Sequence, residues 1–137
     1  MNNSNDAQND TARMLKVALL IQGIVQLVYG VAFLLTPGLL VAISGGAAVD
    51  YGWLRWSGGL LAGLAYGSFR AFRNPTRQGL FVTTMAYASL LTGVGFLIAT
   101  IAGEYTCATW FIVLPMVISF GLAVLIWWGR SQAKAIL

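Results

Sequence analysis

The sequence predicts an all-α integral membrane protein, a bundle of four membrane-spanning helices that run alternately up and down. Hydrophobic residues make up 58% of the 137 residues and charged residues only 9%, so the chain has too little polar surface for a water-soluble domain. The apolar residues gather in four stretches, each near the ~20 residues that cross a ~30 Å hydrocarbon core. All eight basic residues except Arg55 fall on one side of these stretches.

The chain begins with a polar segment. Residues 1–12 (MNNSNDAQNDTA) contain no apolar run, so we predict a disordered cytoplasmic tail. The first span follows at about residues 14–35. It is too long for the apolar part of a cleaved signal and lacks a small-residue cleavage site, so we expect it to remain in the membrane.

A short second helix is predicted directly after the first span. Thr36 can cap it, Pro37 suits its first turn, and Gly45 can end it. Its sequence, PGLLVAI, is too short to cross a membrane but is apolar enough for the headgroup boundary. We therefore expect this helix to lie along the outer interface.

The other three spans are predicted at about residues 53–72, 79–102 and 109–128. The membrane domain then covers residues 13–130, and residues 131–137 form a second cytoplasmic tail. The connections FRNPTRQ and GEYTCA are short, and short connections make sequential helices antiparallel neighbours.

The distribution of charge predicts the orientation. Basic residues precede the first span, fill the turn after the second and follow the fourth, whereas Asp50 and Glu104 stand in the other connections. By the positive-inside rule, both termini are cytoplasmic. The formal charge of +4 therefore points to anionic lipid headgroups rather than nucleic acid, with Arg70, Arg73 and Arg77 as the expected contacts.

Several kinds of chemistry lack the residues they need. The chain has one cysteine, Cys107, and no histidine, so a CxxC redox pair is excluded and we expect no metal, no cofactor and no catalytic residue. None of the predicted spans contains Asp or Glu. Proton-coupled transport, which uses an intramembrane carboxylate, is therefore disfavoured.

Two spans carry faces of small residues. Such faces let helix backbones approach closely in lipid, where packing drives association. We expect the two faces to pack on each other within the bundle, with contact to another chain as the alternative. They consist of Gly59, Gly63 and Gly67 in the second span and of Thr84, Ala88, Thr92 and Gly95 in the third.

A layer of polar side chains is predicted near mid-membrane depth. Amides and hydroxyls at that depth need partners other than lipid. The layer either forms ordinary interhelical hydrogen bonds or lines a pocket that orients a quinone, a sterol-like molecule or another apolar ligand. Its members are Gln22, Gln26 and Tyr29 in the first span, together with Tyr66, Tyr87 and Ser119.

Arg55 is drawn into the outer edge of the second span. An arginine at that depth must snorkel or pair, and Asp50 and Glu104 are the acids on that side. We predict a rim ion pair, with Glu104 as the first choice. The alternative is recognition of an anionic headgroup or a carboxylate ligand by Arg55.

The layout of LLTPGLL, then WLRWSGGLLAGLAYG, then a basic turn and two further helices resembles the DoxX-like group and related small bacterial four-helix membrane proteins. The resemblance implies a four-helix bundle in a bacterial inner membrane. It transfers no catalytic residue to this chain.

The sequence favours a protein that acts by association, either as an accessory or structural subunit of a membrane complex or as a homo-oligomer. The alternative is a binder or carrier of a small apolar ligand held within the bundle. A third hypothesis is a membrane enzyme that uses the outer pair of Arg55 and Glu104.

Overall fold

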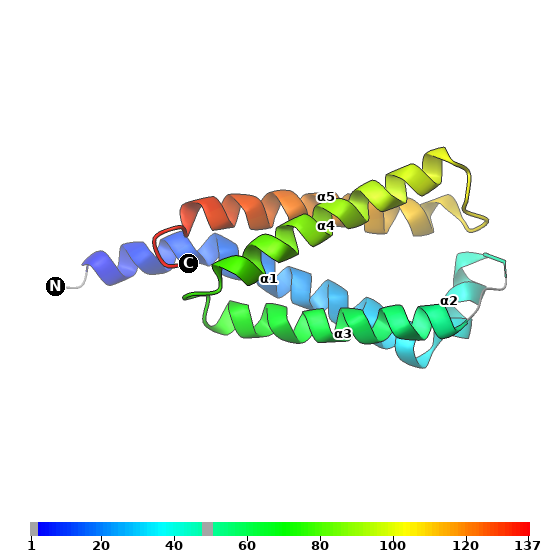
Figure 1. Ribbon diagram of the computed structural model, residues 1–137, viewed down its shortest axis with the longest axis horizontal. Helices are drawn as coiled ribbons and strands as arrows, with labels where there is room; N and C mark the ends of the chain where they lie inside the picture. Colours follow the sequence, from blue (N-terminus) through cyan, green and yellow to red (C-terminus); the bar gives the residue numbers. More distant parts are fainter. Residues whose placement is uncertain (1–2, 48–50) are drawn as a thin grey trace.

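The computed structural model describes residues 3–47 and 51–137, with side chains from residue 12 onward. Within these ranges the chain is α-helical and contains no strand, which confirms the all-α prediction (Figure 1). The helices are α1 (Asn3–Leu35), α2 (Pro37–Ser44), α3 (Tyr51–Arg73), α4 (Gly79–Ile101) and α5 (Thr109–Gln132).

In the described part of the chain, three segments are long and apolar enough to cross a membrane. They are Ala12–Leu35, Gly79–Ile101 and Thr109–Gln132. Helix α3 is as long as α4, with 23 residues each, but its glycines, its serines and its three arginines make it less apolar. The three segments support a membrane environment. The predicted span at about residues 53–72, which falls in α3, is not among them.

Both predicted tails are more structured than expected. Helix α1 begins at Asn3, so residues 3–12, predicted to be disordered, are helical; an established helix extends at little cost per residue. At the other end, α5 continues to Gln132, and Ala133 is buried. The Arg77 backbone N–H donates to the Ile136 carbonyl at 3.3 Å, so the C-terminal segment packs against the turn between α3 and α4.

The helices form two antiparallel pairs, α1 with α3 and α4 with α5. Helix α1 also packs along α5, whereas α3 and α4 meet at few points although a short turn joins them. The prediction that sequential helices are neighbours is therefore correct for α4 and α5 and wrong for α3 and α4. Because α3 packs along α1, most of α3 is not in contact with α4.

Glycines determine how closely the paired helices approach. A Cβ atom added to Gly58 would lie 2.7 Å from the backbone nitrogen of Leu34, and one added to Gly30 would lie 2.9 Å from the nitrogen of Ala62. The backbones of α1 and α3 are thus in direct contact. In the other pair, Gly93 accommodates the ring of Phe120.

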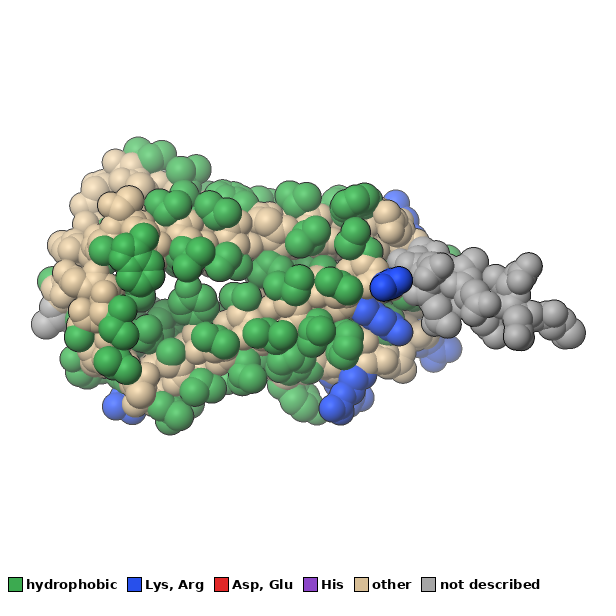
Figure 2. All heavy atoms as spheres, turned by 180° about the vertical axis from the view of Figure 1, so that it is seen from behind, with side chains coloured by type: hydrophobic (Ala, Val, Ile, Leu, Met, Phe, Trp, Pro, Cys, Tyr) green, Lys and Arg blue, Asp and Glu red, His purple; other side chains and the backbone are tan. Residues whose placement is uncertain are grey.

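The two pairs are closely packed at the end of the molecule that carries Arg13, Lys16, Arg70, Arg73, Arg77, Arg130 and Lys134, called here the basic end. Figure 2 shows these blue side chains gathered at that end. A Cβ on Gly129 would lie 2.8 Å from the Leu15 Cα atom, so α5 touches the α1 backbone there. Leu15, Leu19, Val82, Met85 and Ile126 form a fully buried core beside it.

We predict that Gly58→Ala destabilises the protein by about 1–3 kcal/mol, because the new methyl group must displace the α1 backbone. Gly59→Ala is the matched control, since no described atom lies within 4 Å of its added Cβ. This control should be neutral or raise stability by about 0.5–1 kcal/mol through helix propensity. Thermal unfolding in detergent measures both changes, and equal behaviour of the two variants would contradict the observed face of α3.

Candidate functional site

A cavity of about 600 Å³ lies between the two helix pairs in the half of the molecule away from the basic end. This half, called here the far end, contains α2 and the connection between α4 and α5 (Figure 1). Figure 2 shows an opening through the molecule in this half. The two pairs are therefore packed at the basic end and enclose the cavity at the far end, where the Ala108 N–H donates to the Ser44 carbonyl at 2.8 Å and joins them again.

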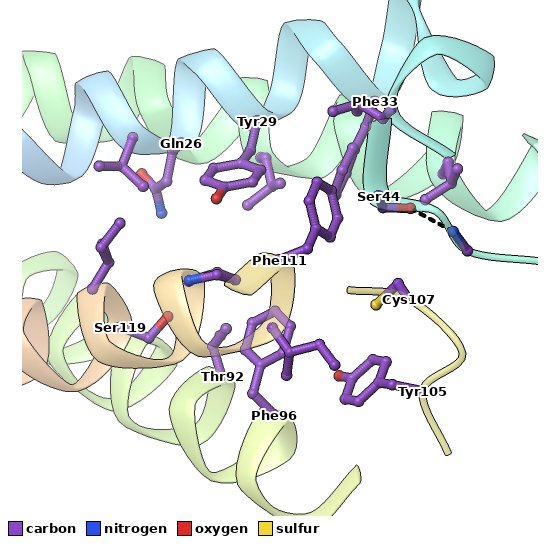
Figure 3. A pocket seen from close by; sticks show the side chains of 18 of the residues that line it. Gln26, Tyr29, Phe33, Ser44, Thr92, Phe96, Tyr105, Cys107, Phe111 and Ser119 are labelled. Atoms are coloured by element: carbon purple, nitrogen blue, oxygen red, sulfur yellow. Dashed lines mark hydrogen bonds between the residues drawn. The ribbon is translucent and has the colours of Figure 1, made fainter. Parts of the chain in front are cut away.

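The walls of the cavity are mainly apolar. Phe33 from α1 and Phe111 from α5 face each other across it, and Phe96 of α4 lies on the α4–α5 side (Figure 3). Pro115 also lines it, which places the proline of α5 beside the opening. Phe33 and Phe111 thus extend into the space between the pairs from opposite sides.

The floor of the cavity, toward the basic end, contains two glutamines that are each only 5% exposed. The Ser89 hydroxyl donates to Gln22 Oε1 at 3.2 Å, and the Ser68 hydroxyl donates to Gln26 Oε1 at 3.0 Å. The Gln26 amide nitrogen lies 3.8 Å from the Met85 sulfur. These contacts link α1 to α3 and α4 at the boundary between core and cavity.

The sequence analysis did not single out Ser68 and Ser89. Serine within an apolar helix often forms a hydrogen bond with its own backbone or with a neighbouring helix. The presence of these serines in apolar helices was therefore the sequence feature that could have indicated them. Their role depends on facing Gln26 and Gln22, and this depends on helix rotation.

Four of the six predicted layer residues line the cavity: Gln22, Gln26, Tyr29 and Ser119. The other two do not, because Tyr66 is 69% exposed and Tyr87 is 51% exposed. Tyr87 instead packs edge-on against Trp127, with ring centroids 5.6 Å apart. The prediction of one layer with a member from every helix is therefore wrong for both tyrosines, because equal depth does not place side chains on the same side of their helices.

The predicted pairing of two small-residue faces is also wrong over most of its length. No described atom lies within 4 Å of a Cβ added to Gly59, Gly63 or Gly95. The exception is Gly67, whose added Cβ would lie 2.6 Å from the Phe81 ring. On α4, Ala88 and Thr92 line the cavity, whereas Thr84 is exposed and donates to the Leu80 carbonyl. Gly58, Ala65, Ser68 and Ala71 are the buried residues of α3 instead.

The predicted ion pair between Arg55 and Glu104 is not formed. The Arg55 guanidinium donates to the Leu34 carbonyl at 3.1 Å, and this carbonyl belongs to the last turn of α1, where helical acceptors are left over. Asp50 lies outside the described residues. Glu104 lines the mouth of the cavity at the far end, with Tyr105 and Cys107.

Tyr105 stacks on Phe96 beside this mouth, with ring centroids 6.3 Å apart. Burial raises the pKa of its hydroxyl above the ordinary value, and the charges of Cys107 and Glu104 raise it further. Tyr105 is therefore a neutral group at neutral pH.

At the basic end, Arg70 and Arg73 are exposed and line a second hollow together with Tyr66 and Phe69. Arg77 is exposed in the turn. Arg130 is held more firmly, because its Nε donates to the Thr83 hydroxyl at 2.7 Å and its guanidinium lies 5.5 Å from the Trp127 ring centre. Within the described residues, no cluster of His, Cys, Asp or Glu is arranged to bind a metal ion.

Comparisons with protein-family models, curated proteins and solved structures gave no match. The resemblance to the DoxX-like group therefore stays a prediction. The cavity and its polar floor are the features of the structure that point to a function.

Proposed function

We propose that this chain is a four-span membrane protein that binds a small apolar ligand between its two helix pairs. The observation that carries the proposal is the cavity of about 600 Å³, which falls within the roughly 300–1,000 Å³ typical of ligand sites. Its apolar walls and few polar groups also match such sites. This was the alternative hypothesis from the sequence, and the geometry now favours it.

Packing of α3 supports a fourth span. Contacts with α1 run along α3, from Gly58 against Leu34 to Phe69 against Gly23. Because α1 is apolar enough to cross a membrane, a helix that packs along it shares its depth. The less apolar composition of α3 is then tolerable, since its buried face meets protein rather than lipid.

In the proposed orientation, the basic end faces the cytoplasm and anionic lipid headgroups surround Arg70, Arg73 and Arg77. Helix α2 would lie at the outer interface, with Leu39 and Ile43 exposed to the headgroup boundary. A bacterial inner membrane is the proposed location, following the DoxX-like resemblance. The cavity then opens in the outer half of the bilayer.

Association with another membrane protein or with a second copy is a second candidate. The observation that favours it is the open strip of Gly59 and Gly63 on α3, next to exposed Leu60. Small residues on a lipid-facing surface allow close approach of another helix. Such association is compatible with ligand binding, because the strip and the cavity lie on different faces of α3.

Blocking the cavity should abolish ligand binding. We predict that Ser119→Phe removes saturable labelling of cavity residues by an uncharged alkyl-diazirine probe in vesicles, because the ring occupies the ligand space. Val117→Phe on the same helix is the control, since Val117 is 59% exposed away from the site. Peptide mapping by mass spectrometry locates the label. Unsaturable labelling of the cavity in the unmodified protein, equal to that of the lipid-facing surface, would overturn the proposal.

The proposed orientation can be tested with the cysteine already present. Cys107 is partly exposed in the connection between α4 and α5. We expect a membrane-impermeant maleimide to label it from outside intact cells, and Cys107→Ser to remove the signal. Labelling that requires permeabilised cells would reverse the orientation.

Association through α3 predicts a change in particle mass. Gly63→Ile should lower the mass measured in a mild detergent, because the branched side chain separates the two surfaces. Gly121→Ile is the matched control, since its added Cβ also meets no described atom within 4 Å but belongs to α5. An unmodified protein that is already monomeric and free of other chains would eliminate this candidate.

A further inference from the structure

The oxygens of the two glutamines on the cavity floor have hydrogen-bond partners, whereas their nitrogens have weak partners or none among the described residues. Both glutamine oxygens already accept a hydrogen bond from a serine. The Gln26 nitrogen has only the Met85 sulfur at 3.8 Å, and a thioether is a weak acceptor. Among the described residues, no acceptor is bonded to the Gln22 nitrogen. The floor therefore presents spare N–H donors.

Tyr29 extends this set of donors. Its hydroxyl takes part in none of the hydrogen bonds between described residues, and its ring packs edge-on against Phe33 at 5.9 Å. Figure 3 shows the Tyr29 hydroxyl and the Gln26 nitrogen pointing into the cavity, with Ser119 across from them. Because an amide N–H₂ can only donate and a phenol O–H can also donate, a ligand that brings an acceptor atom complements these groups.

The charge of the site restricts the ligand further. Glu104, at the mouth, is the one charged residue among those described that line the cavity. A charged group at the floor would have no counter-ion, and an uncompensated charge at that depth is costly. The group that reaches the floor must therefore be neutral.

We infer that the cavity floor recognises an uncharged carbonyl group at the end of an apolar ligand, through the spare donors of Gln22, Gln26 and Tyr29. This inference rests on the proposed function. The apolar body of the ligand would lie between Phe33 and Phe111. A quinone ring and the ester of a neutral lipid share this chemistry.

Competition against the saturable photolabel in vesicles tests the inference. The competitors are a decyl-substituted quinone, a short-chain diacylglycerol and decylbenzene, which lacks a carbonyl. At least one carbonyl compound should compete at about tenfold lower concentration than decylbenzene, the effect expected for about one hydrogen bond in an apolar site. The stronger of the two identifies the source of the carbonyl.

Variants assign this preference to the floor. Tyr29→Phe and Gln22→Leu should each lower the preference for the carbonyl compound, because each removes one of the donors that together produce it. Tyr29→Phe is the safer variant, because the hydroxyl it removes has no described protein partner. Thr84→Val is the control on α4 outside the cavity, since Thr84 is exposed and its hydroxyl donates to the Leu80 carbonyl at 2.9 Å; the preference of this variant should be unchanged.

The outcomes separate this inference from the proposed function. If decylbenzene competes as well as both carbonyl compounds, the cavity binds ligands without reading a carbonyl and the inference is wrong. A preference that survives in Tyr29→Phe and Gln22→Leu also overturns it. If no compound competes, the proposed function fails, and the inference fails with it.

Discussion

The contact between Gly129 of α5 and Leu15 of α1 determines the shape of this molecule. In lipid, no hydrophobic force draws helices together, so they close only where their surfaces fit. Glycine permits backbone contact between the two pairs at the basic end. Farther along, Phe33 and Phe111 extend into the space between the pairs (Figure 3), and the close fit is lost. The molecule therefore has a packed half at the glycine contact and a hollow half that the hydrogen bond from the Ala108 N–H to the Ser44 carbonyl closes at the far end.

The two glutamines mark the boundary between these halves. A buried amide needs hydrogen bonds, and burial without them costs about 1–3 kcal/mol. Ser68 and Ser89 satisfy the oxygens of Gln26 and Gln22, which ties α3 and α4 to α1 although α3 packs on α4 at few points. The Gln26 nitrogen points into the cavity (Figure 3), and Gln22 lines the same floor. The same side chains thus hold the helices together and give the floor its chemical character.

Sequence patterns predicted the positions of the helices better than they predicted which residues of neighbouring helices are in contact. Length, hydropathy and turn residues located α2, α4 and α5 to within a few residues, because these signals are local. The contacts depend on rotation about each helix axis. Gly58 and Gly59 are adjacent and chemically identical, yet one touches α1 and the other is open. The approach of the α1 backbone at Gly30 and Leu34 distinguishes them, and spacing within α3 does not contain that information. For the same reason, Gln22 and Ser119 line the cavity, whereas Tyr66 and Tyr87 of similar predicted depth face away from it.

A ligand that enters a cavity within a membrane protein competes with lipid acyl chains for that space. Acyl chains can fill an apolar space, and they offer Phe33 or Phe111 the same contacts as any apolar ligand. The walls of this cavity therefore provide volume but little discrimination. Selectivity has to come from groups that acyl chains cannot satisfy, namely the spare donors of Gln22, Gln26 and Tyr29. Unsatisfied buried polar groups are costly. A ligand that supplies acceptors to the floor therefore binds there more favourably than an acyl chain, which has none.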